Sequence, residues 1–170
     1  MHRDSVEAGA QEVFGMRIAI GSDELTHLTE CVVEDVKQRG HELDLFGSMV
    51  DSQEDWPGVA QQVAERVATG EVDEGILLCW TGTGVCLAAN KVPGVRAALC
   101  DDAETARGAR IWNNANVLCL SIRRSAEVVT KEILDIWFST EYQPNEEDDG
   151  CLAQLAAIEK KHLRQLNRLR

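Results

Sequence analysis

The sequence is poor in positive charge. It has 17 basic residues against 29 acidic ones in 170 positions, which gives a formal net charge of −12. A chain with this balance repels the phosphates of nucleic acids and of anionic membrane surfaces unless a basic patch is strongly localised. We therefore expect no nucleic-acid partner and no membrane partner.

The sequence also lacks the cysteine spacing of a zinc site or a disulfide scaffold. Its six cysteines are scattered, with no CxxC pair among them, and no secretory signal stands ahead of them. No apolar run approaches the roughly 18 residues that a membrane-spanning helix needs. These absences predict a soluble protein of the reducing cytoplasm, with no metal and no cofactor.

The sequence does contain a regular alternation of apolar runs and helical patterns. With 44% hydrophobic residues, the chain is long enough for one substantial core and one main domain. The runs MRIAIGS, HELDLFG, EGILLC, VRAALC and ANVLCL predict five strands. Helical patterns are expected at about 26–39, 57–69, from 84 onward, 102–112 and 125–138. Runs such as GILLC are apolar at consecutive positions, as in strands covered on both faces, so we predict a doubly wound, Rossmann-like three-layer α/β sandwich with a parallel sheet.

The two ends of the chain differ from this pattern. Residues 1–15 show no strong period and are expected to form a flexible extension before an α/β domain at 16–140. Residues 141–170 are expected to form an acidic loop, EYQPNEEDDG, followed by an amphipathic helix from Cys151 with leucines at mostly three-residue steps and a basic end. We expect this helix to pack on its own domain or on a partner subunit.

The stretch CWTGTGVCLAANK, residues 79–91, is the most distinctive. It ends an apolar run with a cysteine, continues with two glycines two positions apart, and then enters a helical pattern. It is not a phosphate-binding P-loop, because that motif needs a lysine directly after its last glycine and the first lysine here is Lys91. It is a poor dinucleotide fingerprint, because Leu87 stands where the third glycine is required.

What remains is a turn in which Gly82 and Gly84 let backbone N–H groups converge at a helix N-terminus as a small anion hole. The Cys79 thiolate would be favoured there and can act as a base or a nucleophile. The alternative is a structural cysteine buried in a strand. Because ligands of doubly wound sheets bind beyond the carboxyl ends of the strands, Cys79 is expected at the same end as Ser22–Asp23 and Asp101.

Four segments carry a family resemblance. MRIAIGSDE, GEVDEGILLCWTGTGVCLAANKVPGVRAALC, DAETARGAR and NNANVLCLSIR resemble the family of ribose-5-phosphate isomerase B and galactose-6-phosphate isomerase, from about Met16 to Phe138. The resemblance implies an aldose–ketose isomerase that moves a proton between neighbouring carbons of a small sugar or sugar phosphate through a cis-enediolate. It also implies a homodimer, or a dimer of dimers, with sites at a subunit interface.

The resemblance assigns roles to individual residues. Cys79 corresponds to the base, Thr81 to a hydroxyl that helps to move protons on the sugar oxygens, and Asp23 to a carboxylate that orients a sugar hydroxyl. A thiolate that takes the proton and N–H groups that hold the enediolate oxygen suit this chemistry. The expected substrate contacts are Ser22, Gly82, Thr83, Gly84, Asp101, Trp112, Asn113, Arg107 and Arg110.

Most of these residues also have a purely structural use. Asp23 suits a helix cap, Thr81 a helix-entry hydroxyl and Asn113 a turn. Trp112 suits a core or interface aromatic. The two arginines suit a solvated helix face.

The sequence departs from the family pattern at three places. Glu24 stands where histidine is usual, and Trp112 stands where the family has its ring-opening histidine. The stretch PNEEDDG stands where the family carries phosphate-binding arginines, and carboxylates cannot replace guanidinium groups at a phosphate. We therefore expect ribose-5-phosphate to be a poor substrate. The alternative function is a catalytically silent sugar-binding or regulatory protein of the same fold.

Overall fold

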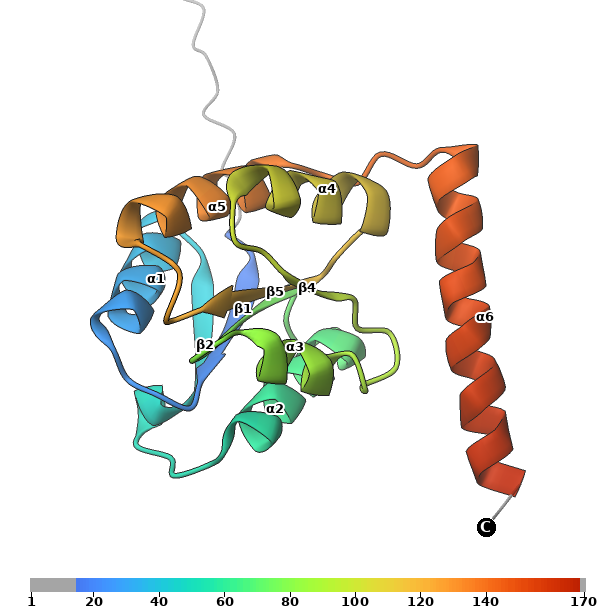
Figure 1. Ribbon diagram of the computed structural model, residues 1–170, viewed down its shortest axis with the longest axis horizontal. Coiled ribbons are helices and arrows are strands. Elements are labelled where there is room, and N and C mark those ends of the chain that lie inside the picture. The colour runs from blue at the N-terminus through green and yellow to red at the C-terminus, as the bar shows by residue number, and fades with distance from the viewer. Residues whose placement is uncertain (1–14, 169–170) are drawn as a thin grey trace, which may run out of the picture.

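The computed structural model describes residues 15–168, so the predicted extension at 1–15 lies almost wholly outside the described residues. Strands and helices alternate along the chain (Figure 1). The elements are β1 (Arg17–Ser22), α1 (His27–Gln38), β2 (Glu42–Gly47), the short 3₁₀ helix η1 (Ser48–Val50), α2 (Trp56–Thr69), β3 (Glu74–Cys79), α3 (Thr83–Ala89), β4 (Ala97–Leu99), α4 (Ala103–Asn113), β5 (Val117–Ser121), α5 (Glu127–Ser139) and α6 (Glu146–Arg168).

The five strands form one parallel sheet in the order β2-β1-β3-β5-β4. Helices α1, α4 and α5 cover one face of the sheet, and α2 and α3 cover the other (Figure 1). This confirms the predicted three-layer α/β sandwich with five parallel strands. The carboxyl ends of β1, β3 and β5 lie side by side, because these strands are neighbours in the middle of the sheet.

The core has two layers, one on each face of the sheet. In β1, the fully buried Ile18 and Ile20 belong to the layer beneath α1 and α5, whereas Ala19 belongs to the layer beneath α2. Each fully buried large aliphatic side chain contributes about 1.5–3 kcal/mol to folding. Burial on both faces explains why the strands are apolar at consecutive positions.

A buried ion pair closes the amino end of the sheet. Arg110 on α4 donates to Glu74 at the start of β3 over 2.7 Å, and both side chains are almost inaccessible to solvent. The indole nitrogen of Trp137 donates to the same carboxylate over 2.6 Å, and the Arg110 guanidinium lies 4.9 Å from the centre of the Trp137 ring. Burial raises the pKa of Glu74, although the Arg110 charge and the two hydrogen bonds act in the opposite direction.

The C-terminal helix begins earlier than the sequence suggested. The acidic stretch expected to be a loop forms the first turns of α6, which starts at Glu146. The Asn145 side chain accepts the Asp148 N–H over 2.9 Å, as a helix cap does. Carboxylates in a first turn are also stabilised by the helix dipole, so the acidic composition favours a helix start here.

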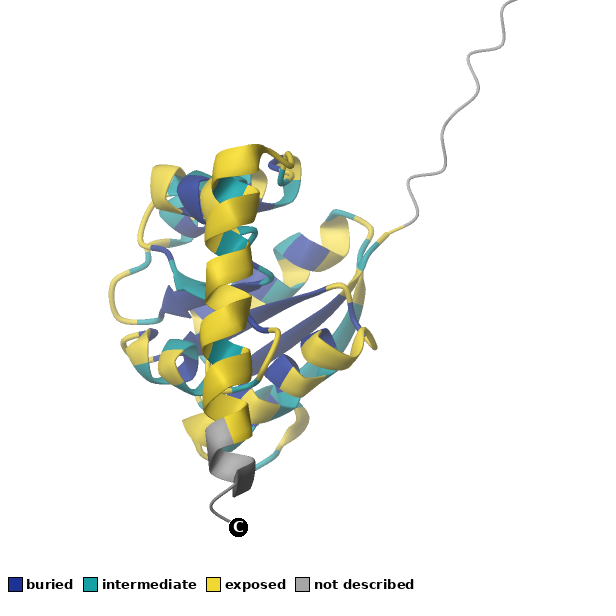
Figure 2. Ribbon diagram, turned by 90° about the vertical axis from the view of Figure 1, so that its right-hand side faces the viewer, coloured by how far each residue is buried: buried dark blue, intermediate teal, exposed yellow. Residues whose placement is uncertain are grey.

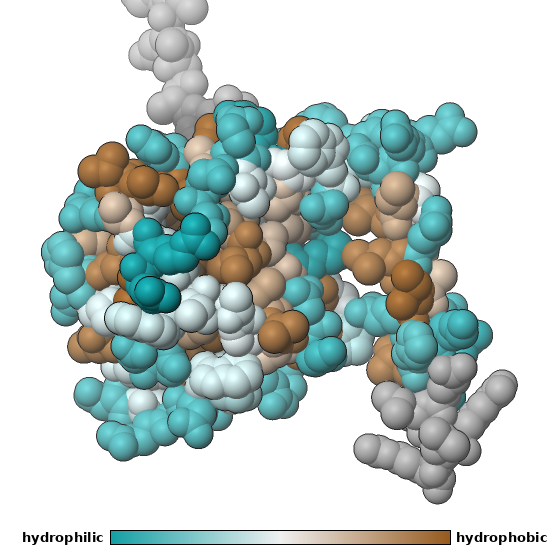
Figure 3. Space-filling view, viewed as in Figure 1, coloured by the Kyte–Doolittle hydropathy of each residue, from teal (hydrophilic) through white to brown (hydrophobic). Residues whose placement is uncertain are grey.

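Helix α6 stands beside the body of the protein, next to β4, and most of its length is exposed (Figure 2). Apolar side chains lie on the side of α6 that faces the body (Figure 3). Within the described part of the chain, no helix is long and apolar enough to cross a membrane.

Candidate active site

The turn between β3 and α3 fixes the backbone of Cys79. The Cys79 carbonyl accepts two hydrogen bonds, from the Gly82 N–H over 3.2 Å and from the Ile122 N–H over 3.0 Å. Gly82 has a φ of 73°, a left-handed conformation that suits glycine. Cys79 itself is buried, with 6% of its surface exposed. The sequence pattern of cysteine followed by a tight glycine turn is therefore confirmed as a strand–turn–helix junction.

The first residues of α3 follow directly on the loop between β3 and α3. Thr83, Gly84 and Val85 are its first three helical residues, and N–H groups at these positions have no intrahelical acceptor. The Gly82 N–H differs, because it already donates to Cys79. The anion hole predicted at Gly82, Thr83 and Gly84 thus has its available donors at the two later positions.

Hydroxyls lie beside these donors. Thr81 and Thr83 are hydrogen-bonded to each other through their side-chain oxygens over 2.7 Å. Both residues are exposed. The structure thus brings Cys79, Thr81, Thr83 and Gly84 together in one turn at the carboxyl end of the sheet.

Asp23 lies at the neighbouring strand end. Ser22 pairs in register with Leu78, so Asp23 and Cys79 are the residues that directly follow this pair on two adjacent strands. Within residues 15–168, the Asp23 Oδ1 atom is buried and has no hydrogen-bond partner. Burial raises the pKa of Asp23, the Asp55 charge raises it further, and its own N–H lowers it.

The cap of α1 is Thr26, which forms a reciprocal capping box with Thr29, so Asp23 is not used as a helix cap. Ser22 has a structural role instead: its hydroxyl donates to the Glu24 carbonyl over 2.8 Å and accepts the Glu24 N–H over 3.3 Å. Of the Ser22 hydroxyl and the Asp23 carboxylate, the carboxylate is therefore the group that is more available to a substrate.

Two exposed tryptophans flank the turn, and sequence reasoning singled out neither. Trp80 follows Cys79 directly and is 54% exposed. Trp56, the first residue of α2, lies against Gly84: a Cβ at position 84 would be 3.1 Å from the Trp56 ring. The DWPG sequence could have indicated this position. A proline in the first turn marks a helix start, and a helix that follows a parallel strand starts at the carboxyl end of the sheet.

Asp101 lies at the carboxyl end of the sheet as predicted, between β4 and α4. Its carboxylate pairs with the Arg124 guanidinium over 3.0 Å. Arg124 follows β5, and its N–H donates to the Ser121 hydroxyl, which in turn donates to the Trp80 carbonyl. Arg124 is a cation of this end that sequence reasoning missed.

Trp112 and Asn113 lie elsewhere, at the end of α4. This helix starts beyond β4 at the carboxyl end and runs back to the amino end, where the Asn116 carbonyl accepts the Gly75 N–H. Cys79 is four positions along β3 from Gly75, which is about 13 Å of strand. Within one chain, Trp112 and Asn113 are therefore at the opposite end of the sheet from Cys79.

The two predicted arginine ligands have protein partners. Arg110 is held in the buried pair with Glu74, and it also donates to the Ala115 carbonyl over 2.6 Å. Arg107 pairs with Glu104, one turn earlier on the exposed face of α4, over 3.3 Å.

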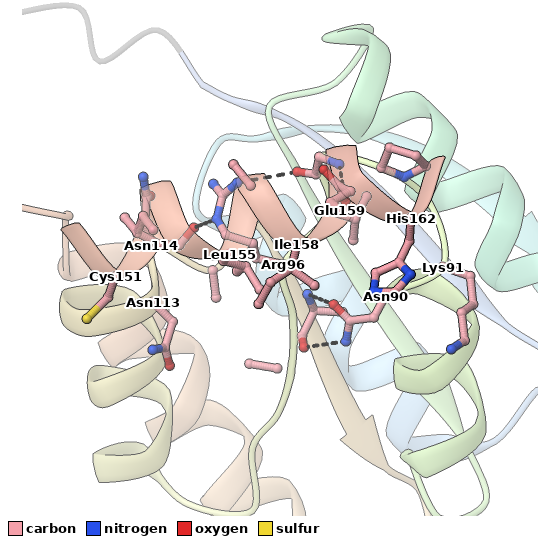
Figure 4. A pocket seen from close by; sticks show the side chains of 18 of the residues that line it. Asn90, Lys91, Arg96, Asn113, Asn114, Cys151, Leu155, Ile158, Glu159 and His162 are labelled. Atoms are coloured by element: carbon pink, nitrogen blue, oxygen red, sulfur yellow. Dashed lines mark hydrogen bonds between the residues drawn. The ribbon is translucent and has the colours of Figure 1, made fainter. Parts of the chain in front are cut away.

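A cavity beside α6 is a separate feature of the described residues. It has a volume of about 1010 Å³ and lies between α6 and the body, where it is lined by Asn113, Leu155 and Ile158 among others (Figure 4). Glu159 spans it and accepts the Gly94 N–H over 3.0 Å. Neither Cys79 nor Asp23 lines this cavity.

Known proteins are similar to this chain in sequence and in fold. The family model described as Ribose/Galactose Isomerase matches residues 18–155. The chain belongs to this family. Ribose-5-phosphate isomerase B of Escherichia coli is 36% identical over 146 residues, which cover 85% of this chain and 97% of the relative. Galactose-6-phosphate isomerase subunit LacB of Clostridium acetobutylicum is 36% identical over 138 residues, covering 81% and 80%.

A solved structure of the ribose/galactose isomerase family agrees with the fold. Ribose-5-phosphate isomerase B of Clostridium thermocellum superposes with a TM-score of 0.80 at 39% identity, covering 86% of this chain and 99% of its own. The family resemblance inferred from the sequence is confirmed.

The Cys86 thiol is a further feature that the sequence pattern did not indicate. Cys86 on α3 is partly buried, and its pKa is lowered to about 7, chiefly by a hydrogen bond from the Cys119 thiol. Burial raises the pKa of Cys119 itself. The Asn90 amide also donates to the Cys86 sulfur. No pattern in the sequence pairs these side chains, because they come from α3 and β5.

Proposed function

We propose that this protein is an aldose–ketose isomerase of a small sugar or sugar phosphate, with Cys79 as the base. The observation that carries the proposal is the junction at Cys79, where a thiol at a strand end precedes a left-handed glycine and the open N–H groups of α3. Membership of the ribose/galactose isomerase family supports the same reaction.

The reaction needs a base and a holder for negative charge. The Cys79 thiolate takes the proton next to the carbonyl carbon and returns it to the neighbouring carbon, so that the sugar passes through a cis-enediolate. The N–H groups of Thr83 and Gly84 stabilise the enediolate oxygen. The Thr81 hydroxyl passes protons between the sugar oxygens.

Asp23 orients the substrate. Its buried Oδ1 atom lacks a partner within the described residues, and a buried acceptor gains most from a hydroxyl donor. A sugar hydroxyl at this position satisfies the oxygen and fixes the reacting carbons near Cys79. The Trp56 ring, which lies against Gly84, gives the site an apolar wall.

The active form is a homodimer in which a second copy completes the site. Trp112 and Asn113 belong to the predicted substrate contacts, yet one chain holds them at the opposite end of its sheet from Cys79. A second copy that presents the end of its α4 brings both sets to one sugar. The apolar side of α6, with Leu155 and Ile158 exposed, supplies contact surface for this assembly.

Among the described residues, the site offers few cations to bind a phosphate group of the substrate. Arg110 is committed to Glu74, and the acidic start of α6 occupies the stretch where the family's arginines are expected. Arg124 remains at the carboxyl end, paired with one exposed carboxylate. We expect an unphosphorylated sugar to be turned over at least as well as ribose-5-phosphate.

The test is the uptake of solvent deuterium at C2 by a panel of tetroses, pentoses and their phosphates. The wild-type protein should exchange at least one member, and Cys79→Ala should lose about 10²–10⁴-fold or more of the rate. Cys151→Ala is the matched control, because that cysteine is exposed on α6, far along the chain from the turn. A Cys79→Ala protein with full turnover would refute the assignment of the base.

A silent sugar-binding protein is the second candidate, and Trp112 favours it. An exposed tryptophan in place of a ring-opening histidine leaves no acid–base group at that position. Measurable sugar binding, combined with no exchange of any sugar in the panel, would identify this second function. Exchange that starts only from open-chain sugars would instead show that Trp112 costs ring opening alone.

A further inference from the structure

A cluster of three metal-ligating side chains lies outside the candidate active site. His27 and Cys31 are one turn apart on α1, and Glu127 is the first residue of α5. Their nearest ligand atoms all lie within 4.8 Å of one another. The spacing of four residues puts the histidine and the cysteine on one face of the helix.

The distances in this cluster match those around a tetrahedral ion. Bonds of about 2.05 Å to nitrogen, 2.1 Å to oxygen and 2.3 Å to sulfur place N and O about 3.4 Å apart, and N and S about 3.6 Å apart. The His27 Nε2 atom lies 3.4 Å from Glu127 Oε2 and 3.4 Å from Cys31 Sγ. Two of the three ligand pairs therefore have nearly the separation that a tetrahedral ion requires, and the third pair lies within 4.8 Å.

The two oxygens of the Glu127 carboxylate face different partners. Its Oε1 atom accepts from the Lys131 ammonium over 2.8 Å, whereas Oε2 faces His27. One oxygen is thus held by the protein and the other is directed at the centre of the cluster. This is the arrangement in which a carboxylate binds a metal through one oxygen.

The surroundings favour a cation. The cluster opens into a surface recess of about 320 Å³ that is also lined by Glu30, Glu34 and Asp35. Among the described residues of this lining, Lys131 is the one lysine or arginine. Asp35 pairs with Arg39 over 2.6 Å, so Glu30 and Glu34 give the recess its excess of negative charge. A recess of this size also has room for water as a fourth ligand.

We propose that His27, Cys31 and Glu127 bind a Zn²⁺ ion that fastens the first turn of α1 to the first turn of α5. The ligand set of imidazole, thiolate and carboxylate suits zinc, whereas calcium and magnesium prefer oxygen ligands alone. On binding, the Cys31 thiol forms a bond to zinc and releases its proton to solvent. The site uses no residue of the proposed catalytic turn, so it stands or falls independently of the proposed activity.

The experiment titrates the full metal-free chain with Co²⁺, a spectroscopic substitute for zinc. We expect one equivalent of cobalt to produce a thiolate-to-cobalt charge-transfer band, and zinc to displace it because zinc binds such ligands more tightly. Loss of an outer partner of a metal site already costs about 10–100-fold in affinity, so Cys31→Ser, His27→Gln and Glu127→Gln should each cost at least that. Cys31→Ser should also abolish the band.

Cys151→Ser is the matched control, since it removes an exposed thiol outside the cluster and should leave the titration unchanged. All ligand substitutions fall on surface positions, and unfolding curves without metal check that the variants fold. Glu127→Gln decides whether the ion bridges the two helices. Unchanged affinity in that variant, a band that survives Cys31→Ser, or no band in the wild-type protein would each overturn the proposal.

Discussion

Replacement of Arg110 by alanine tests whether this residue is a structural cation or a ligand of the substrate. The variant removes the 2.7 Å ion pair with Glu74 and the hydrogen bond to the Ala115 carbonyl. Among residues 15–168, Glu74 is then left buried with the Trp137 indole as its one remaining side-chain partner. Removing one member of a buried pair costs about 3–5 kcal/mol in the free energy of unfolding. At about 2–4 °C per kcal/mol for a chain of this size, the melting temperature should fall by about 6–20 °C.

The cost should depend on pH. The pKa of Glu74 is raised by burial and held down by Arg110, so the variant raises it further. A raised carboxyl pKa means that the folded state keeps a proton which the unfolded state has lost, and stability then falls as pH rises through that interval. The difference in unfolding free energy between wild type and Arg110→Ala should therefore be smaller at about pH 5 than at about pH 7.5.

Urea unfolding followed by circular dichroism measures both effects. Arg107→Ala is the matched control on the same helix. In the described part of the chain Arg107 pairs with the exposed Glu104 alone, so the variant should change stability by no more than about 0.5 kcal/mol. An Arg110→Ala protein as stable as Arg107→Ala at neutral pH would refute the structural role. If that stable protein also lost sugar binding, Arg110 would be a ligand, as the sequence first suggested.

Three shorter predictions follow from the same structure. Gly82→Ala should destabilise the protein by about 1–3 kcal/mol and abolish exchange, because a Cβ at this left-handed residue would lie 2.5 Å from the Leu99 side chain; thermal unfolding and the deuterium assay check this. Alkylation by iodoacetamide at Cys86 should accelerate as pH rises through about 7, as mass spectrometry of digested protein would show, and a rate insensitive to pH would contradict the lowered pKa. Truncation after Gly150 should shift the mass in light scattering towards the monomer or cause aggregation, whereas an unchanged, stable dimer would exclude α6 from the interface.

The sequence predicted the fold well because burial on both faces of the sheet leaves a direct record in the strands. Runs such as GILLC and NVLCL have few polar alternate positions, as expected for strands of a parallel sheet between two helical layers. The predicted start of the C-terminal helix was wrong, because five acidic residues beside a proline have the composition of a loop. Their position at a helix N-terminus, capped by Asn145, reverses that preference.

The candidate site was predicted only where its members are close in sequence or follow strand ends. Cys79, Thr81 and Thr83 share one turn, and Asp23 follows the neighbouring strand, so their proximity was accessible. The direction of α4 was not considered, and it carries Trp112 to the other end of the sheet. Arg124 and Trp56 were missed because their positions depend on how separate segments pack.

The turn at Cys79 also has an order of assembly. Its carbonyl groups are bonded by the N–H groups of Ile122 and Arg123 and by the Ser121 hydroxyl, which is 41 positions further along the chain than Trp80. Because β5 inserts between β3 and β4, the turn cannot reach its final shape until that late strand has docked. A nascent chain that ends before β5 therefore carries Cys79 and both glycines without the bonds that fix them. Amide hydrogen exchange should accordingly protect Ile122 and Gly82 as one cooperative unit, which opens only when β5 leaves the sheet.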